Sequence, residues 1–503
     1  MTWVGVIARL RASWESRQGR SRRNSASLLA AQVVERAAGY GFLVYVTRSF
    51  GATLYGTYQT VATLFAMAGT LCDFGLANLV TRDVAKDRKR ASEFLSKLIL
   101  LKAVLTLGAY GLLLVAIQVL GFPWDVTGLV ALASLTSLWG LLTGLLGPSL
   151  VGYERADLTS TASMVASVCT AGLGILALHL GMGLSGVLGG WFLVGGLQAG
   201  LLMRMARREG IVMRAMVDGR LAREALKRAT PFGLIAIGLI HNSTAIVVLS
   251  HSAGPEAVGF YAAARRPLEL LFVIPASILG ALYPVMASYH RQASPLFLET
   301  YLRNVHLMIR LAVPIVVGCS LAGESIMALL FGEPFRMAGS TFRVLSWALA
   351  LAFMTSAADS VIYSAEWVQG FLRFFWLKVL VHVGLDLFLI PRWSYLGAGW
   401  ATLASEVVDF LTHVYFIQQV LGHVPKFQRL ALGVLPPALG MAGVMMMLRD
   451  HSILFSLLGG LTAYGLVLLL ECWTFPSVES HVQGCDAPVQ REATSPPKGK
   501  AIP

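Results

Sequence analysis

Ionisable side chains occur inside long apolar segments of this sequence, where each charge needs a partner or a water-filled cavity. Arg36 lies near the middle of the segment 25–48, with Gln32 and Tyr40 on the same helical face and Glu35 at its edge. A guanidinium in a cavity can bind a pyrophosphate group through paired hydrogen bonds. Alternatively, Arg36 pairs with Glu35 or Gln32 and only orders the helix.

Two later segments carry polar residues that we also assign to a cavity. His241 and Asn242 lie in the middle of one segment, at a depth similar to that of Arg36. Arg265 and Arg266 begin the next, with Glu269 one turn later. A residue and its fourth neighbour face each other on a helix, so Arg265 and Glu269 can equally form a simple surface ion pair. Arg265 and Arg266 are expected near the outer side of the membrane, where positive charge is otherwise scarce. We therefore also consider a role in substrate release.

The densest pattern lies in two consecutive segments near residue 400, each with three ionisable residues on one helical face. These residues are Lys378, His382 and Asp386 in the first segment and Glu406, Asp409 and His413 in the second. Counting from the segment ends brings Lys378 level with Asp409 and His382 roughly level with Glu406, so we expect the two faces to meet. A buried ion-pair seam and a proton relay or substrate contact both remain open. Asp359 could line the cavity.

Spacings that resemble catalytic motifs occur in the wrong context. The GxGxxG at 181–186 joins two apolar segments, and the DFG at 73–75 lacks the companion motifs of a kinase. No metal-ligand or catalytic-triad spacing is found, and the loops on the outer side are too short to hold catalytic carboxylates. The sequence therefore predicts no enzyme, no cofactor and no metal site.

The elements that hold these residues are predicted to be membrane helices. Hydrophobic residues make up 56% of the 503 residues and charged residues 13%, which is too little polar surface for a soluble protein. Fourteen apolar segments are long enough to cross about 30 Å of hydrocarbon. They are 25–48, 55–80, 97–120, 125–150, 158–180, 184–204, 229–250, 262–288, 304–331, 340–364, 370–390, 395–420, 429–448 and 452–473.

Lysine and arginine gather in alternate loops. The loops around 88–90, 155 and 204–228 are basic, whereas the turns at 122–126 and 180–184 have no Lys or Arg. By the positive-inside rule, the basic loops and both termini are cytoplasmic. This distribution explains the excess of 40 Lys and Arg over 27 Asp and Glu without a nucleic-acid partner.

An internal repeat organises the segments. GATLYGTY from Gly51 and GPEAVGFY from Gly254 both join one segment to its successor, so segments one to six repeat as seven to twelve. Six is an even number, so the halves insert in the same orientation and form two six-helix lobes. The expected units are a basic cytoplasmic tail at 1–24, an N-lobe at 25–228, a C-lobe at 229–424, two further helices at 425–473 and a disordered cytoplasmic tail at 474–503.

Three stretches resemble bacterial polysaccharide flippases, the oligosaccharide exporters of the multidrug/oligosaccharidyl-lipid/polysaccharide exporter superfamily. The first is FGATLYGTY from Phe50 with CDFGLANLVTRDVA from Cys72. The others are AGPEAVGFYAAARRPLELLFVIPASILGALYPVMAS from Ala253 and LLFGEPFRMAGSTFRVLSWALALAFMTSAADSVIYSAEW from Leu329. Together they span most of the chain in the family's order.

Two lobes related by a repeat, short outer turns and charges near the middle of the membrane fit an alternating-access transporter. The resemblance implies that it is a flippase in the cytoplasmic (inner) membrane of a bacterium or archaeon. Its substrate would be an oligosaccharide linked to undecaprenyl pyrophosphate, moved from the cytoplasmic to the outer leaflet for surface polysaccharide assembly, as for the O-antigen of lipopolysaccharide. Expected partners are this substrate and membrane lipids, with a polysaccharide polymerase and glycosyltransferases as candidates. An ion-coupled small-molecule antiporter of the same superfamily and a non-transporting scaffold remain alternatives. The glycan, the coupling ion and the oligomeric state stay open.

Overall fold

The computed structural model describes the backbone of residues 3–214, 216, 218–365, 368–422 and 432–474. Within these ranges it describes the side chains except those of 3–30, 32, 368–373 and 471–474. All the regular elements in this part of the chain are helices, so the predicted all-α class is confirmed.

Residues 3–208 form seven α-helices and one 3-10 helix. They are α1 (Trp3–Asp73), α2 (Leu76–Lys86), η1 (Arg88–Arg90), α3 (Ala91–Val119), α4 (Trp124–Ser134), α5 (Ser137–Gly152), α6 (Ala156–His179) and α7 (Gly183–Arg208). Glycine and proline separate several of them, because a positive φ or a missing N–H ends a helix at low cost. Gly121 and Gly181, for example, have φ values of 73° and 72° in the turns before α4 and α7.

The chain continues with α8 (Gly219–Leu239), η2 (Ile240–Ser243), α9 (Thr244–Ser252), α10 (Gly254–Leu271) and α11 (Val273–Arg291). It continues with α12 (Leu296–Phe331), η3 (Glu333–Ala338), α13 (Gly339–Ser364), α14 (Val368–Leu421), α16 (Leu435–Met447) and α17 (Ile453–Thr474).

Two of the long helices are in fact hairpins. Gly51 has φ 75° and ψ −174°, which is not helical, and the rings of Phe42 and Tyr58 on either side of it lie 5.6 Å apart. A straight helix would separate these residues by about 24 Å. Ser394 interrupts α14 in the same way, since the Nζ of Lys378 lies 2.8 Å from a carboxylate oxygen of Glu406.

These hairpins reconcile the helices with the fourteen predicted segments. Among the described residues, ten helical stretches are long and apolar enough to cross a membrane, or eleven when the pair joined by a 42° bend before Leu76 counts as one. The reversals at Gly51 and Ser394 each add a crossing, and α16 is a shorter apolar helix. The polytopic architecture with about fourteen membrane segments is therefore confirmed for the described chain.

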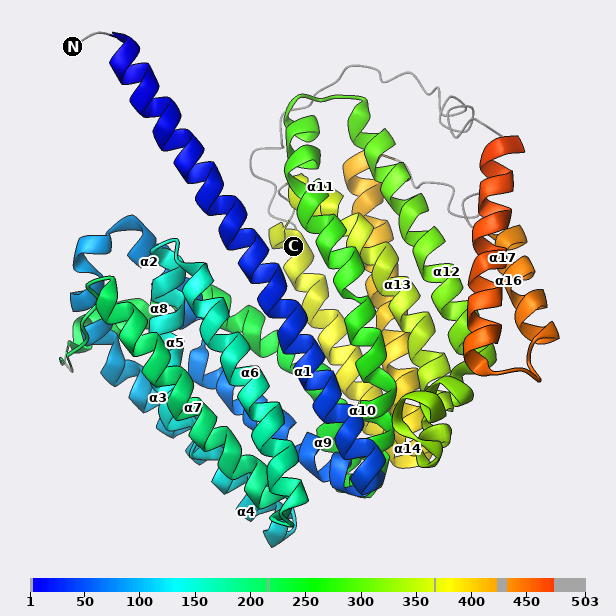
Figure 1. Ribbon diagram of the computed structural model, residues 1–503, viewed down its shortest axis with the longest axis horizontal. Coiled ribbons are helices and arrows are strands. Elements are labelled where there is room, and N and C mark those ends of the chain that lie inside the picture. Colours follow the sequence, from blue (N-terminus) through cyan, green and yellow to red (C-terminus); the bar gives the residue numbers. More distant parts are fainter. Residues whose placement is uncertain (1–2, 215, 217, 366–367, 423–431, 475–503) are drawn as a thin grey trace, which may run out of the picture.

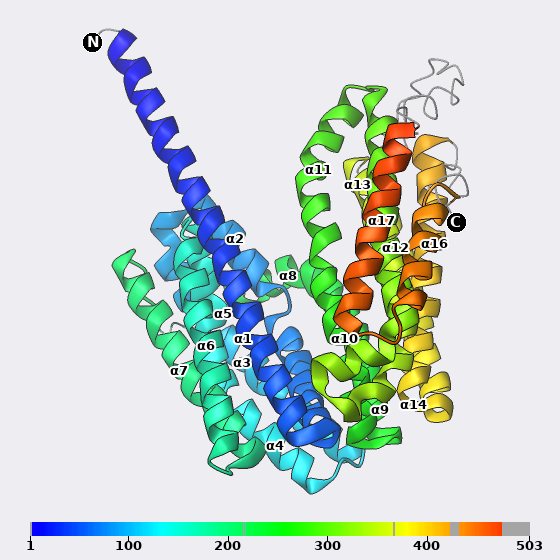
Figure 2. The same ribbon diagram turned by 45° about the vertical axis from the view of Figure 1, so that its right-hand side comes forward.

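The helices form two bundles (Figure 1). One contains α2 to α7 and the other α10 to α14, and α1 lies between them, packed on both α6 and α10. α16 and α17 pack on α12 at the edge of the second bundle. The start of α1 and the end of α17 lie at the same end of the molecule, and the ribbons of the two bundles diverge toward that end (Figure 2).

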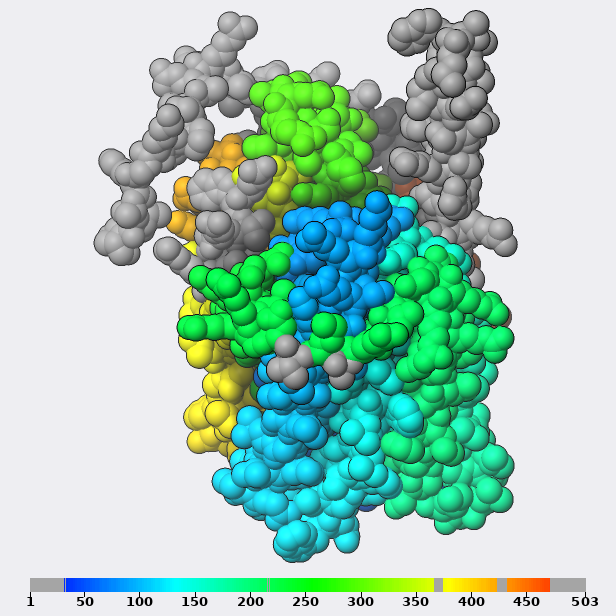
Figure 3. Space-filling model, turned by 90° about the vertical axis from the view of Figure 1, so that its left-hand side faces the viewer, coloured from blue at the N-terminus to red at the C-terminus, as the bar shows by residue number. Residues whose placement is uncertain are grey.

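The bundles meet closely at the other end. A Cβ on Gly56 would lie 1.7 Å from the carbonyl oxygen of Pro255, and one on Gly259 would lie 2.2 Å from that of Ala52. Only glycine allows these backbones to approach so closely. A second contact joins α8 to the first bundle, where Arg228 pairs with Asp83 of α2 at 2.6 Å. Figure 3 shows this region, with α8 in green beside the blue surface of α2.

Candidate functional site

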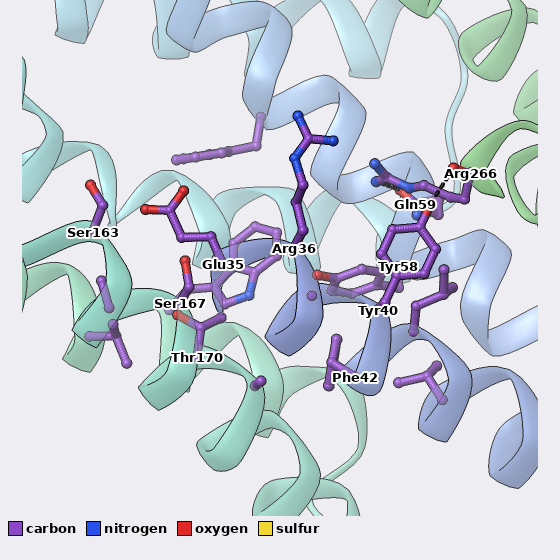
Figure 4. Close-up of a pocket in the computed structure, with 18 of the residues that line it drawn as sticks. Glu35, Arg36, Tyr40, Phe42, Tyr58, Gln59, Ser163, Ser167, Thr170 and Arg266 are labelled. Atoms are coloured by element: carbon purple, nitrogen blue, oxygen red, sulfur yellow. Dashed lines mark hydrogen bonds between the residues drawn. The ribbon is translucent and has the colours of Figure 1, made fainter. Parts of the chain in front are cut away.

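A central cavity of about 680 Å³ lies between the bundles. Its walls come from both halves of the α1 hairpin, from α6 and α7 of the first bundle, and from α10 of the second. Figure 4 shows its polar residues, which point into the space from several helices. A polar cavity shared by two bundles is the usual position for a transporter's substrate site.

Arg36 and Glu35 line this cavity from the first half of α1. The Arg36 side chain is exposed, and no ion-pair partner for it is found among the residues whose side chains are described. Arg36 thus lies on the cavity wall, and no ion pair between it and Glu35 is found among the described side chains; its role in binding stays a prediction. The side chain of Gln32 lies outside the described part of the chain.

The second cation of the cavity comes from α10. An Nη of Arg266 lies 3.1 Å from a carboxylate oxygen of Glu269, and its other Nη donates to the side-chain oxygen of Gln59 at 3.4 Å. The hydroxyl of Tyr40 donates to the backbone carbonyl of Arg266. Gln59 and Tyr40 belong to the two halves of the α1 hairpin, so the turn at Gly51 brings both halves against Arg266.

The other polar residues predicted near this cavity lie outside its wall. Arg265 pairs with Glu269 at 2.8 Å and donates to the backbone carbonyl of Asn242 at 2.5 Å, which ties α10 to η2. The exposed side chain of Asn242 donates to the carbonyl of Leu239 at 3.3 Å. His241 is only 4% exposed, and its Nδ1 lies 2.7 Å from the carbonyl oxygen of Gly238.

The two ionisable faces of α14 meet across its hairpin. The Nζ of Lys378 lies 2.8 Å from Glu406 and 2.9 Å from Asp409. His413 continues the cluster, with its Nε2 3.3 Å from Asp359 of α13. The expected meeting of Lys378 with Asp409 is therefore confirmed. We call these five residues the C-bundle ion cluster.

His382 lies elsewhere than the sequence count suggests. Its ring is 5.2 Å from that of His241 in η2, and its Nε2 is 3.7 Å from Asp386 one turn along α14. Asp386 is fully buried and accepts a hydrogen bond of 2.7 Å from the hydroxyl of Thr244. The ionisable face of α14 thus packs partly on η2 and α9, and neither this pair nor the C-bundle ion cluster lines the central cavity.

Sequence reasoning missed the hydroxyl residues on one side of the cavity. Ser163, Ser167 and Thr170 of α6 line it, together with Gln198 and Trp191 of α7. The spacing of the three hydroxyl residues by four and three positions was a readable signal, because such residues share a helical face. Serine and threonine are also common at packed faces of membrane helices, so this spacing alone does not mark a cavity.

A buried pair in the first bundle was also missed. The Nζ of Lys102 lies 2.9 Å from Asp73, and the Lys102 side chain is 3% exposed. The partners lie 29 positions apart on different helices, and no local spacing marks such a contact. No group of three or more potential metal ligands is found among the described residues.

Comparisons with known proteins place these features in a family. Residues 21–290 match the family model described as "Polysaccharide biosynthesis protein". The chain is 20% identical to the probable low-salt glycan biosynthesis flippase Agl15 of Haloferax volcanii over 438 residues, covering 84% of this chain and 89% of that protein. It is 22% identical to a putative O-antigen transporter of Shigella flexneri over 398 residues, covering 73% and 91%.

A solved structure has the same fold. The lipid II flippase MurJ in an inward closed conformation superposes with a TM-score of 0.74, covering 90% of this chain and 99% of that one at 13% identity. At this identity the likeness concerns the fold alone. The family model, by contrast, covers more than half of the sequence. The chain therefore belongs to the polysaccharide biosynthesis protein family.

Proposed function

We propose that this protein is an alternating-access flippase for a lipid-linked oligosaccharide. The names of the glycan flippase and the O-antigen transporter to which the sequence is similar support the substrate class. The substrate would enter from the cytoplasmic leaflet and leave to the outer one, with undecaprenyl pyrophosphate as its carrier. This is transport of an intact molecule, so the chain needs no catalytic group.

The observation that carries the proposal is the pair of guanidinium groups in the central cavity. Arg36 is exposed there on α1, and Arg266 is held in place on α10. Arginine binds phosphate oxygens through two parallel hydrogen bonds, so two such groups suit a pyrophosphate. The prenyl chain would stay in the lipid between the bundles while the phosphates and sugars occupy the cavity.

The arrangement of the bundles supports a rocking motion. α1 packs tightly on α10 of the second bundle where Gly56 meets Pro255, at the end that the charge distribution assigns to the outer side. The opposite end carries the basic residues of η1 and the start of α1. The state described here would therefore be open to the cytoplasm. The protein would lie in the cytoplasmic membrane, with both termini on the cytoplasmic side.

The test is the access of a lectin to a lipid-linked oligosaccharide in sealed proteoliposomes. Native protein should expose the glycan on the far leaflet, and Arg36→Ala should slow this exposure about tenfold or more, because a charge-assisted hydrogen bond is lost. Arg303→Ala is a matched control, since Arg303 pairs on the surface with Glu299. No exposure by native protein above that of empty vesicles, for several glycans and under imposed ion gradients, would overturn the proposal.

A small-molecule antiporter is the second candidate. Glu35 and Glu269 also line the cavity, and carboxylates there would suit a cationic solute. A cation antiporter would lose transport on Glu35→Gln and keep it on Arg36→Ala, which is the reverse of our expectation. A scaffold for a polymerase or glycosyltransferases would tolerate both changes.

A further inference from the structure

Three hydroxyl side chains form a stripe along the cavity side of α6. Ser163, Ser167 and Thr170 lie on successive turns and all line the cavity (Figure 4). Ser163 accepts a hydrogen bond of 3.4 Å from the side-chain amide of Gln198 on α7. The hydroxyls of Ser167 and Thr170 have no hydrogen-bond partner among the described residues.

Other hydroxyls of the same helix behave differently. Ser160 donates to the carbonyl of Ala156 at 2.9 Å, and Thr161 donates to that of Asp157 at 2.8 Å. Hydroxyls in membrane helices usually satisfy themselves on the preceding turn in this way, because a free polar group is costly there. The free hydroxyls of Ser167 and Thr170 are thus available to water or to a ligand in the cavity.

An aromatic side chain adjoins this stripe. The ring of Trp191 on α7 lies 5.7 Å from that of Tyr58 and 5.9 Å from that of Phe65, and all three line the cavity. Its indole N–H is buried and has no hydrogen-bond partner in the described part of the chain. The wall therefore combines an apolar aromatic surface with the free hydroxyls of Ser167 and Thr170. Sugars need the same combination, since a pyranose ring has an apolar C–H face and an edge of hydroxyls.

The cations lie apart from this wall. Figure 4 shows Ser163, Ser167 and Thr170 on one side of Arg36, and Gln59 and Arg266 on the other. Glu35 lies on the hydroxyl side, where its carboxylate can accept hydrogen bonds from sugar hydroxyls but would repel an acidic sugar. The cavity thus has one side with Arg266 and its partner Glu269 and another with hydroxyl groups and the carboxylate of Glu35, with Arg36 between them.

We propose that the α6–α7 wall of the cavity is a glycan subsite, which binds the uncharged sugars nearest the phosphates while Arg36 and Arg266 hold the phosphates. This inference rests on the proposed flippase function and adds where, and by which residues, the sugar is recognised. Ser167, Thr170 and Gln198 are its hydrogen-bonding residues, and Trp191 is its stacking surface. The wall belongs to the first bundle alone, so that bundle would set the preference for the glycan.

The experiment compares two probes on purified protein in nanodiscs. One is undecaprenyl pyrophosphate without sugar, and the other is undecaprenyl pyrophosphate carrying a neutral tetrasaccharide. The double variant Ser167→Ala, Thr170→Val should weaken binding of the glycan-bearing probe about tenfold, as expected for the loss of two neutral hydrogen bonds. It should leave binding of the bare pyrophosphate within about twofold of native. Arg36→Ala should weaken both probes.

The matched control is Thr161→Val, which removes a hydroxyl of the same helix that bonds to its own backbone. Thermal melting of each variant shows whether it is folded. Equal weakening of both probes by the double variant, or no weakening of either, would overturn the glycan subsite while native binding and flipping still support the flippase. If native protein binds neither probe, the proposed function and the subsite both fail.

Discussion

Arg36 in the central cavity and Lys378 in the C-bundle ion cluster have opposite electrostatic environments. Arg36 faces the cavity without an ion pair among the described side chains, whereas Lys378 contacts two carboxylates at 2.8 and 2.9 Å. The side chains of Lys378, Glu406 and Asp409 are only 15%, 17% and 14% exposed. Arg36 is therefore open to water or a ligand in the cavity, whereas Lys378, Glu406 and Asp409 neutralise one another.

This difference teaches that a charge in a membrane helix does not by itself mark a transport site. The cluster joins the two halves of the α14 hairpin and, through His413 and Asp359, connects them to α13. Its geometry suffices to explain its residues as a structural connection. Arg36 has no such explanation among the described side chains, so we expect removal of a cluster charge to affect folding and removal of Arg36 to affect transport.

The largest effect should follow from Lys378→Met. The change leaves Glu406 and Asp409 buried side by side without a counter-ion, which costs about 3 to 5 kcal/mol of folding free energy. Thermal or denaturant unfolding of the purified protein measures this loss. The triple variant with Glu406→Gln and Asp409→Asn should recover most of it. Native stability combined with abolished transport would instead make the cluster part of the transport machinery.

Arg36→Ala should show the reverse pattern. Its melting temperature should stay within about 2 °C of native, because no described ion pair is broken. Flipping should fall about tenfold or more, and Arg36→Lys should restore only part of it, because an ammonium group lacks the paired donors of a guanidinium. A melting temperature that falls in parallel with transport would show that Arg36 is structural and would remove the contrast.

Asp386→Asn tests a buried carboxylate that belongs to neither the central cavity nor the C-bundle ion cluster. Asparagine can keep the hydrogen bond from Thr244, so we expect flipping within about threefold of native and little change in melting. The assay should be run with and without an imposed pH gradient. A variant that melts normally but no longer responds to the gradient would identify Asp386 as a coupling group, contrary to the structural interpretation.

The smallest effect should come from a charge outside the membrane. The backbone N–H of Leu221 and the ammonium of Lys97 hold the pKa of the Asp218 carboxyl below its ordinary value. A lowered pKa in the folded state stabilises the protein above the unfolded pKa of about 4, and this stabilisation is lost as the pH falls through the folded pKa. Asp218→Ala should remove that acid dependence of unfolding.

Asparagine provides the matched control at this position, because it can still cap the start of α8 without carrying a charge. Asp218→Asn should therefore lose the acid dependence and keep more of the stability at neutral pH than Asp218→Ala does. Acid titration of unfolding measures both. An unchanged profile in both variants would mean that the local contact at Asp218 does not affect global unfolding.

The sequence predicted the helices well for a simple reason. Membrane segments are marked by about 20 consecutive apolar residues, and this signal is local. The hairpin turn at Gly51 was likewise visible from its glycine and its repeat at Gly254. The pairing of Lys378 with Asp409 was predictable because the two segments are consecutive and antiparallel, so counting along both aligned the residues.

Contacts between distant helices could not be read in the same way. Nothing local to Arg266 indicates that Tyr40 and Gln59 will surround it, because the partners lie more than 200 positions away. The same holds for His382, which was expected to lie level with Glu406 but packs on His241 instead. Helix rotation and tilt decide such contacts, and they depend on the packing of the whole bundle.

By itself, then, the sequence determined that this chain crosses a membrane many times, where its turns and hairpins lie, and which charges must find a partner or a cavity. Only the tertiary structure decided which charged side chains pair with each other and which face a cavity. It placed Arg36 and Arg266 in one cavity, enclosed Lys378 between two carboxylates and turned the hydroxyls of α6 toward the open space. The physical reason is that burial in a bilayer is a property of segments, whereas solvation of a single side chain is set by its neighbours in space.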